Sequence, residues 1–441
     1  MNARRRELFG LVLAGLIASV ALAIVTLARD AELSPDVFAW TAVFLGLYVV
    51  AHVVIRRTAP FADSALLPLA GVLTVFGVTI LYRLDSDDGR RQAVWIAVGV
   101  VVLAAALIWL RHDYRVLEEY RYLFGVAAIV LLLLPSVPGL GETVNGARLW
   151  VDLGVVQFQP GELAKICLIL FLAGYLREKR ESLARWQLKD LGPLLAIWGA
   201  AMLVILVTND LGSALLNFGI FLAMLYVATG RALFVGVGLA LFVAGAAVLY
   251  TAIDHVQDRV TIWLRPWTEE PVYCALTGEL ELRQNCASYQ LVKSLYSIAN
   301  GGFGGTGLGE GTFTSIDGSQ LIPYLRTDFV FSAIAQELGL IGAAGLLLVF
   351  MLFVVRGMRV ALQADDGFSK LLAAGLTFGF ALQTFIIVGG VLRVVPLTGI
   401  TLPFVSYGGT SIVANFVLLA LLLLVSNRAN AQSSLHGDRP S

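Results

Sequence analysis

The chain has 441 residues, of which 58% are hydrophobic and only 14% are charged. Soluble globular domains carry roughly 25% charged residues, so this composition excludes an ordinary soluble protein and indicates an integral membrane protein. The formal net charge is zero, and in a membrane protein the position of the charges matters more than their sum. Three cysteines are too few for a disulfide-based scaffold.

Apolar segments long enough to cross a bilayer, roughly 17–25 residues each, follow one another along the chain. They lie at residues 8–28, 38–55, 66–84, 92–110, 122–137, 161–176, 190–207, 209–228, 232–253, 329–356, 368–394 and 403–426. Strand-like alternation is absent, which argues against a transmembrane β-barrel. The sequence therefore predicts an all-α polytopic membrane protein with about twelve transmembrane helices.

Arginine and lysine gather in every second connection between these segments. They are Arg4–Arg6, Arg56, Arg57, Arg111, Arg115, Arg121, Arg177, Lys179, Arg180, Arg185, Lys189, Arg231, Arg356, Arg359, Lys370 and Arg428. Because cytoplasmic connections are enriched in these residues, both termini are predicted to be cytoplasmic. The connection at 145–159 and the long polar interval at 254–331 then face outward.

The interval at 254–331 is the largest polar stretch of the chain, and loops of this length are usually functional or disordered. It holds Cys274 and Cys286, which on the outer side favour a disulfide over two unpaired thiols. A glycine-rich run at 301–309 lacks the Gly-Lys-Ser/Thr ending of a P-loop. It is interpreted either as a flexible linker or as backbone that closely approaches a bulky polar substrate.

Polar residues at the edges of the apolar segments mark two further places. Glu162 and Lys165 are three positions apart at a predicted helix start, where they can pair, and Trp150 suits a membrane-interface anchor. Asp210 is placed either to cap the following helix or to project into a polar cavity.

Two more places lie further along the chain. Asp328 is again placed to cap a helix, but Glu337 follows within the same apolar segment, so the two carboxyl groups also suit a general-base or cation site. At 396–410, two prolines and several glycines interrupt apolar sequence and predict a broken or re-entrant segment that lines a cavity. The four places are expected to share one external cavity.

Several motifs together resemble the SEDS family (shape, elongation, division, sporulation), whose members include RodA, FtsW and SpoVE. The matching stretches are 145–165, 210–213, 258–260, 289–290, the glycine-rich run, 321–331 and 402–409. The resemblance implies a ten-helix core preceded here by two extra N-terminal helices. The expected division is 1–60 for the extra helices, 61–253 and 332–427 for the core, 254–331 for the large extracellular loop and 428–441 for a cytoplasmic tail.

The family resemblance implies a peptidoglycan glycosyltransferase in the bacterial cytoplasmic membrane, with its active site on the outer face. Such an enzyme polymerises lipid II into β-1,4 glycan strands beside a class B penicillin-binding protein, the transpeptidase. Residues 209–213 and the early helices favour a RodA-like role in cell elongation. Membrane lipids are expected partners and nucleic acid is not. The alternatives are a flippase for the lipid-linked precursor, an FtsW-like division polymerase, or a structural scaffold.

The resemblance assigns the essential aspartate of the family to Asp328, as general base or cation ligand. The conserved tryptophan, glutamate and lysine correspond to Trp150, Glu162 and Lys165. Positive charge for a leaving pyrophosphate is expected from Arg148, Lys165, Arg259 and Lys293, and further substrate contacts from Asp210, Glu337 and Ser406. A divalent cation, Mg or Mn, held by Asp328 or Glu337 is a further expectation.

Three departures from the family pattern accompany this assignment. Gln336-Glu337 stands where the family frequently has two glutamates, which weakens any scheme with two carboxylates. Lys293 occupies a position where glutamine is common in the family. The part of the loop that carries Cys274 and Cys286 is longer than usual.

Overall fold

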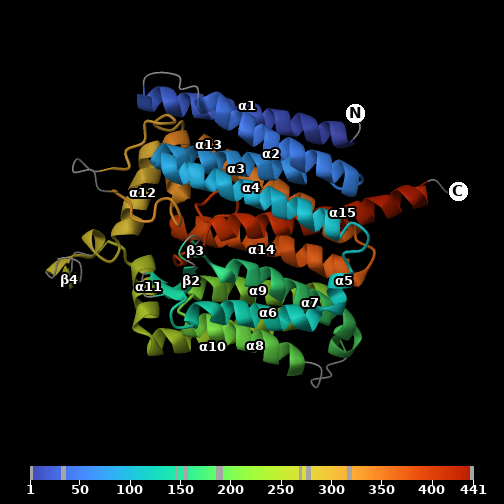
Figure 1. The fold of residues 1–441 in the computed structure, drawn as a ribbon. Helices are drawn as coiled ribbons and strands as arrows, with labels where there is room; N and C mark the ends of the chain where they lie inside the picture. Colours follow the sequence, from blue (N-terminus) through green and yellow to red (C-terminus); the bar gives the residue numbers. More distant parts are fainter. Residues whose placement is uncertain are drawn as a thin grey trace.

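The computed structural model describes residues 3–30, 36–144, 147–152, 154, 157–184, 192–267, 271–274, 280–314 and 320–437. Long helices lie side by side, and the two chain ends lie at the same end of the bundle, opposite α12 and β4 (Figure 1). The long helices are α1 (Ala3–Asp30), α2 (Asp36–Thr58), α3 (Leu66–Leu84), α4 (Ser86–Trp109), α6 (Arg121–Leu133), α7 (Pro160–Ala184), α8 (Gly192–Val207), α9 (Leu211–Thr229), α10 (Ala232–Ala252), α13 (Val330–Gln363), α14 (Gly367–Val391) and α15 (Gly409–Gly437).

Each predicted apolar segment overlaps one of these helices. Over the described residues, nine helices are long and apolar enough to cross a membrane, which makes this a multi-pass membrane protein. Helices α6 and α8 are apolar but shorter, and α7 carries Glu162, Lys165 and Arg177. The count of twelve spans therefore stays a prediction.

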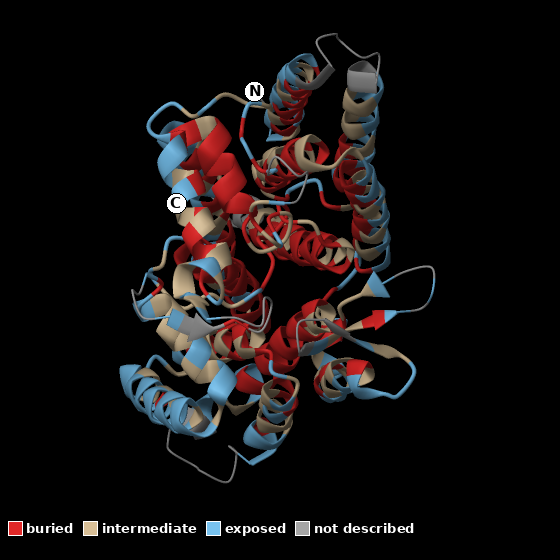
Figure 2. Ribbon diagram, turned by 90° about the vertical axis from the view of Figure 1, so that its left-hand side faces the viewer, coloured by how far each residue is buried: buried red, intermediate tan, exposed pale blue. Residues whose placement is uncertain are grey.

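Burial divides the bundle into interior and peripheral helices. Helices α3, α14 and α15 are buried over most of their length, whereas α10 is exposed almost throughout (Figure 2). Small residues allow close packing of α4 on α15 and of α3 on the segment before α15. A Cβ atom added to Gly99 would lie 2.2 Å from the Phe416 ring, and one added to Gly77 would lie 2.6 Å from the Val405 carbonyl oxygen.

The predicted outer end is folded and contains short strands, so the protein departs locally from an all-α fold. Strands β1 (Gly141–Val144), β2 (Ala147–Asp152) and β3 (Gln157–Phe158) form an antiparallel sheet in the order β1-β2-β3. The polar interval begins with α11 (Asp254–Leu264) and continues with the antiparallel pair β4 (Pro271–Tyr273) and β5 (Leu280–Leu282). The short helix η3 (Arg283–Asn285) and α12 (Tyr289–Gly301) follow.

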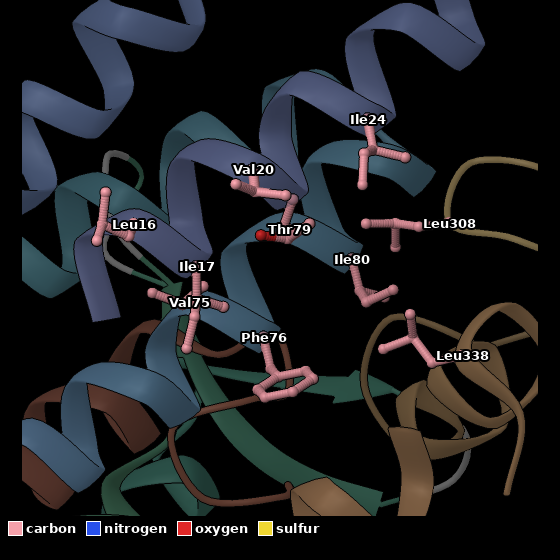
Figure 3. Close-up of a pocket in the computed structure, with 11 residues that line it drawn as sticks. Leu16, Ile17, Val20, Ile24, Val75, Phe76, Thr79, Ile80, Leu308 and Leu338 are labelled. Atoms are coloured by element: carbon pink, nitrogen blue, oxygen red, sulfur yellow. The ribbon is translucent and has the colours of Figure 1, made fainter. Parts of the chain in front are cut away.

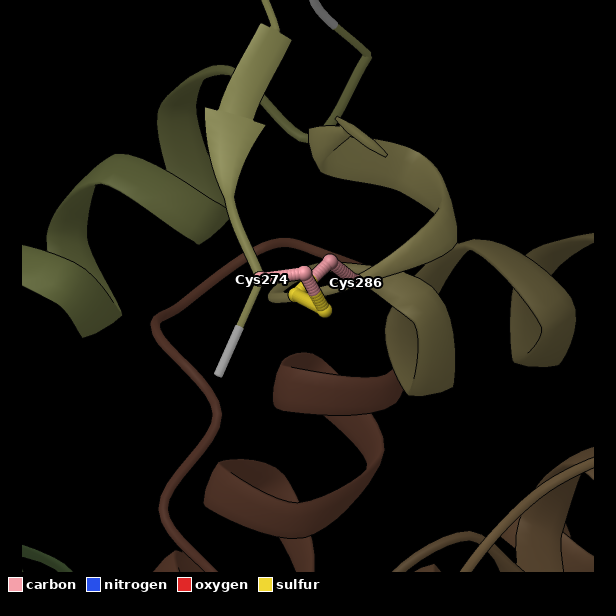
Figure 4. The surroundings of a disulfide bond; sticks show 2 residues. All are labelled: Cys274 and Cys286. Atoms are coloured by element: carbon pink, nitrogen blue, oxygen red, sulfur yellow. A yellow bond between two sulfur atoms is a disulfide. The ribbon is translucent and has the colours of Figure 1, made fainter. Parts of the chain in front are cut away.

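A disulfide bond joins Cys274, after β4, to Cys286, after η3, with the Cα atoms 5.7 Å apart (Figure 4). This confirms the pairing expected from the sequence. The bond ties the β4–β5 hairpin to the turn that leads into α12.

Helix α13 is broken at Gly339, where φ is +65°. Residues 301–311, here called the glycine strap, lie against this break: the N–H groups of Thr306 and Gly307 donate to the carbonyl oxygens of Gln336 (2.9 Å) and Glu337 (3.1 Å). A Cβ atom on Gly305 would lie 2.1 Å from the Glu337 carbonyl oxygen. Gly305 therefore permits close packing inside the protein, and the interpretation that the glycine-rich run approaches a substrate stays a prediction.

Candidate active site at the predicted outer end of the bundle

A polar cavity of about 850 Å³, here called the main cavity, opens at the predicted outer end of the bundle. All four polar places in the sequence contribute to its walls. The residues that line it are Arg91, Trp95, Leu149, Trp150, Gln157, Gln159, Asn209, Asp210, His255, Arg259, Tyr324, Thr327, Asp328, Thr398, Gly399, Thr401, Tyr407, Gly408 and Gly409. The expectation of one shared cavity therefore agrees with the geometry.

A second cavity of about 560 Å³ adjoins the main cavity. The two share His255, Arg259, Tyr324, Asp328 and Gly399. The second cavity is completed by Asp258, Ile262, Arg283, Ala287, Gln290, Leu291 and Leu397. Asp328 and Arg259 therefore lie where the two cavities meet, accessible to groups that bind on either side.

Asp328 lies in the turn before α13, and its backbone N–H donates to the Tyr324 carbonyl oxygen at 3.0 Å. Helix α13 begins after Phe329 without a side-chain cap, so the Asp328 carboxylate is not used as a cap. Burial raises the pKa of this carboxyl group to about 6, although a hydrogen bond from Thr327 and the charge of Arg259 act against the rise. A half-buried carboxylate with such a pKa is suited to accept a proton near neutral pH.

Arg259 reaches the same junction from α11. Its guanidinium group donates from Nη1 to the Leu397 carbonyl oxygen at 2.7 Å and from Nε to His255 Nε2 at 3.1 Å. Burial lowers the pKa of this group, while the carboxylates of Asp328 and Asp210 raise it. The arginine thus supplies positive charge beside the two aspartates.

Asp210 both caps a helix and lines the main cavity. Its Oδ1 accepts the Ser213 N–H at 2.9 Å at the start of α9, and burial raises the pKa of its carboxyl group. Asn209 and Tyr324 in the cavity wall have φ near +60°, a region that side-chain-bearing residues rarely adopt. Backbone strain of this kind is concentrated at functional sites.

Glu162 and Lys165 form a buried network behind the cavity wall. Lys165 Nζ donates to Glu162 Oε2 at 2.8 Å and to Gln383 Oε1 at 2.6 Å. Thr401, which lines the main cavity, donates to Glu162 Oε1 at 3.3 Å, and its carbonyl oxygen accepts from Gln383 Nε2 at 2.9 Å. The pairing predicted from the spacing of three is confirmed, and it supports the wall from behind.

Comparison with known proteins decides the family. Residues 57–431 match the model of a family described as cell cycle protein and named for FtsW, RodA and SpoVE, the SEDS family. The chain belongs to this family. It is 38% identical to the peptidoglycan glycosyltransferase RodA of Mycobacterium tuberculosis, over 97% of this chain and 91% of that protein.

Solved SEDS-like structures share the fold. A chain from a peptidoglycan synthase complex that coordinates polymerization and crosslinking matches with a TM-score of 0.67 and 28% identity, over 83% of this chain and 98% of that one. The Thermus thermophilus rod shape determining protein RodA matches with a TM-score of 0.57 and 26% identity, over 83% and 96%. The family match begins at residue 57, so α1 and most of α2 precede it.

The residues carried over from the SEDS family fall into two groups. Trp150, Asp210, Arg259 and Asp328 line the main cavity. Six others line neither polar cavity: Arg148, Glu162, Lys165, Lys293, Glu337 and Ser406.

The residues that line neither cavity have other surroundings. Ser406 is buried and donates to the Thr327 carbonyl oxygen at 2.5 Å, which holds the turn that carries Asp328. Lys293 Nζ lies 5.4 Å from the centre of the Tyr289 ring, and Arg148 is exposed on β2.

Glu337, expected near Asp328, holds the glycine strap. Its carboxylate accepts the N–H groups of Gly309 (3.1 Å) and Gly311 (3.2 Å) and pairs with Arg83 Nε at 3.2 Å.

Sequence reasoning missed several residues of the site. Tyr324 and Gly399 lie inside the stretches 321–331 and 396–410, which the sequence analysis had already identified, so their location in these stretches was a usable signal. Trp95 lies in an apolar helix and Arg283 in the disulfide-bonded segment, and no sequence motif or spacing indicated that either residue belongs to the site.

A third cavity, of about 450 Å³, lies between α1 and α3 and is also lined by Leu308 and Leu338 (Figure 3). Its lining is apolar except for the hydroxyl group of Thr79, and none of its lining residues is ionisable. It can accommodate hydrocarbon but has no group suited to acid–base chemistry.

Proposed function

We propose that this protein is a RodA-like peptidoglycan glycosyltransferase that polymerises lipid II into β-1,4 glycan strands during cell elongation. The observation that carries the proposal is the position of Asp328 beside Arg259 at the junction of two cavities, in a chain that is 38% identical to a protein named as this enzyme. Asp328 acts as the general base.

The reaction is a single displacement. Asp328 removes the proton from the 4-hydroxyl group of the acceptor sugar, and the oxygen forms a bond to the anomeric carbon of the donor. The bond from that carbon to the lipid pyrophosphate breaks, and the pyrophosphate leaves with the electron pair. One displacement inverts the configuration, as in inverting glycosyl transfer, so an α-linked donor gives a β-1,4 product. A carboxyl pKa of about 6 leaves the base mostly ionised at neutral pH.

Positive charge is needed where the pyrophosphate leaves, because negative charge develops there. Arg259 supplies this charge directly, since its side chain lines both cavities. Lys165 is committed to Glu162 and Gln383, so it acts through the position of Thr401.

A divalent cation, Mg²⁺ or Mn²⁺, would take a set of ligands other than the pair Asp328 and Glu337 that the sequence suggested. Among the described residues, no group of three His, Cys, Asp or Glu side chains is suitably placed to hold a metal ion. Mg²⁺ prefers about six oxygen ligands and commonly takes several from substrate phosphates and water. Asp328 or Asp210 would supply the protein ligand, and the pyrophosphate would supply others.

The lipid tail has an apolar route to the site. A groove of about 560 Å³ is lined by α8 residues, Ile253 and Asn209, and Asn209 also lines the main cavity. A lipid chain in this groove would place its head group at the cavity mouth. Such a groove supports a substrate that stays anchored in the membrane.

The proposed topology has twelve spans, two cytoplasmic termini and the site on the outer face. It is supported by the alternation of basic connections and by the common position of both chain ends, opposite α12 (Figure 1). A disulfide in the same outer region fits an oxidising compartment. The proposed partner is a class B penicillin-binding protein, because one structural relative comes from a complex that couples polymerization to crosslinking.

Polymerisation by purified protein tests this function. Wild type, Asp328→Ala and the control Asp87→Ala, whose side chain is exposed, would be incubated with lipid II, with and without the partner. We expect glycan polymer from wild type and the control, and none from Asp328→Ala. Polymer from a well-folded Asp328→Ala protein would exclude the general-base role. EDTA followed by added Mg²⁺ or Mn²⁺ tests the cation, and a lipid-flipping assay in liposomes tests the flippase alternative.

A further inference from the structure

The second cavity contains an arginine to which no role has yet been given. Arg283 lines this cavity from η3, and its side chain is half-buried. Among the described residues its guanidinium group has no hydrogen-bond or ion-pair partner, and its Nε is buried without one. Arg259, the other arginine in this cavity, is bonded to Leu397 and His255.

The guanidinium group of Arg283 lies at a cavity wall with its Nε atom buried and unpaired. It carries five N–H donors in a fixed plane, and buried donors are nearly always paired. Its geometry matches the two oxygens of a carboxylate or a phosphate, which it binds through two parallel hydrogen bonds. No carboxylate among the described residues pairs with Arg283, and the geometry of its guanidinium group suits an anionic group of a ligand.

The backbone that carries Arg283 is held firmly. The Arg283 carbonyl oxygen accepts the N–H groups of Cys286 at 3.1 Å and Ser288 at 2.9 Å. Cys286 is bonded to Cys274 at the end of β4 (Figure 4). The disulfide thus fixes the turn from one side and α12 fixes it from the other, which is how binding side chains are held ready for a ligand.

The second cavity holds both positively and negatively charged side chains around Arg283. His255, Asp258, Arg259 and Asp328 are the other ionisable side chains in the second cavity, apart from Tyr324. Asp258 is exposed, and Asp328 lies at the junction with the main cavity. Arg259 donates its hydrogen bonds to neutral acceptors, but its charge is shared with the carboxylates of Asp328 and Asp210, so Arg283 is the arginine of this cavity that is left to bind an anion.

We propose that Arg283 is a substrate-binding residue that takes an anionic oxyacid group, carboxylate or phosphate, of the lipid-linked glycan substrate. The proposal rests on the proposed function. The Cys274–Cys286 disulfide positions the arginine. The anion comes either from a peptide carboxylate or from the pyrophosphate of the substrate, and the two sources are separable by experiment.

Steady-state polymerisation kinetics test the proposal with wild type, Arg283→Ala, Arg283→Lys and the control Arg265→Ala. Arg265 is exposed in the same region and lines neither cavity. Loss of a charge-assisted pair predicts a KM raised roughly 10–100-fold with kcat close to wild type. Arg283→Lys is expected to be intermediate, because an ammonium group keeps the charge but loses the planar fork.

Two substrates distinguish the sources of the anion: lipid II with free peptide carboxylates and lipid II with these groups amidated. If a carboxylate is bound, the amidated substrate already has a high KM with wild type and the variants change it no further. If a phosphate is bound, both substrates respond equally to the variants. A wild-type KM for Arg283→Ala with both substrates would overturn the proposal, as would a lower kcat with unchanged KM. Absence of polymer from wild type would instead refute the proposed function.

Discussion

Gly399 lies directly against the Asp328 carboxylate: a Cβ atom added to the glycine would be 3.5 Å from Asp328 Oδ2, and the glycine has φ of +73°. The contact itself is of ordinary length, so alanine would fit beside the carboxylate. The cost comes from the backbone, because an L-residue in this region is disfavoured by roughly 1–2 kcal/mol. The segment that faces the proposed base would shift to relieve this strain.

We therefore expect Gly399→Ala to lower the polymerisation rate several-fold while the protein remains folded. The matched control is Gly236→Ala in α10, where an added Cβ meets nothing within 4 Å. Rates per folded protein, with folding checked by size-exclusion profile and thermal unfolding, would decide this. Equal rates for the two variants would show that the carboxylate tolerates movement of the segment.

The raised pKa of Asp328 predicts a pH dependence of activity. Below about pH 6 the carboxyl group is protonated and cannot accept a proton, so kcat/KM should fall by about tenfold per pH unit. Above about pH 6 the carboxyl group is ionised, so ionisation of Asp328 should cause no further change in kcat/KM. Asp328→Asn should be nearly inactive at every pH. A wild-type profile that stays level down to pH 5 would contradict the assignment.

The same carboxyl group has a defined effect on stability. Its pKa is raised from the ordinary aspartate value of 3.8 to about 6 in the folded protein, so folding favours the protonated form. Its stabilising contribution is present below pH 3.8 and is lost as the pH rises through 6. Asp328→Asn should therefore unfold at a higher temperature than wild type at about pH 7.5, and the difference should disappear near pH 4. Thermal unfolding in detergent at both pH values measures this.

The glycine strap predicts that two neighbouring glycines behave differently. A Cβ atom at Gly305 would lie 2.1 Å from the Glu337 carbonyl oxygen, whereas one at Gly304 meets nothing within 4 Å. Gly305→Ala should destabilise the protein by about 2 kcal/mol or more, because the break in α13 has to open. Gly304→Ala should change stability by less than about 0.5 kcal/mol. Similar unfolding temperatures for both variants would show that the strap is loosely held.

The buried Glu162–Lys165 pair predicts non-additive effects. Removing one partner leaves an uncompensated buried charge, which typically costs about 3–5 kcal/mol. Lys165→Met alone should strongly lower the unfolding temperature, and the double variant Glu162→Gln/Lys165→Met should recover much of the loss. A double-mutant cycle measures the coupling. If the two single effects simply added, the pair would not act as a unit.

Local patterns in the sequence predicted much of this structure, because they reflect short-range physics. Hydrophobic stretches found the long helices, and a spacing of three residues found the Glu162–Lys165 pair. The capping role of Asp210 and the disulfide between Cys274 and Cys286 also followed from neighbours in the sequence. Each of these features is decided within one or two turns of helix or within one loop.

Features that depend on distant segments were not predictable in this way. The sequence suggested a joint site for Asp328 and Glu337, but the strap inserts at the break in α13 and takes both oxygens of Glu337. Arg283 went unnoticed because the cavity it faces is assembled from α11, α12 and the segment after α14. A pattern within one stretch of sequence does not show which distant segments will lie together in the fold.

The contacts that close the main cavity also restrict when it can form during synthesis. Gln92 in α4 donates to the Ser406 carbonyl oxygen at 3.1 Å and accepts the Gly408 N–H at 3.3 Å, across sequence separations of 314 and 316 residues. Translation and membrane insertion run from the N-terminus. A ribosome-bound chain that ends before residue 406 has most of its helices in the bilayer but lacks this wall. The enzyme is therefore expected to reach its competent form only in the final steps of biogenesis.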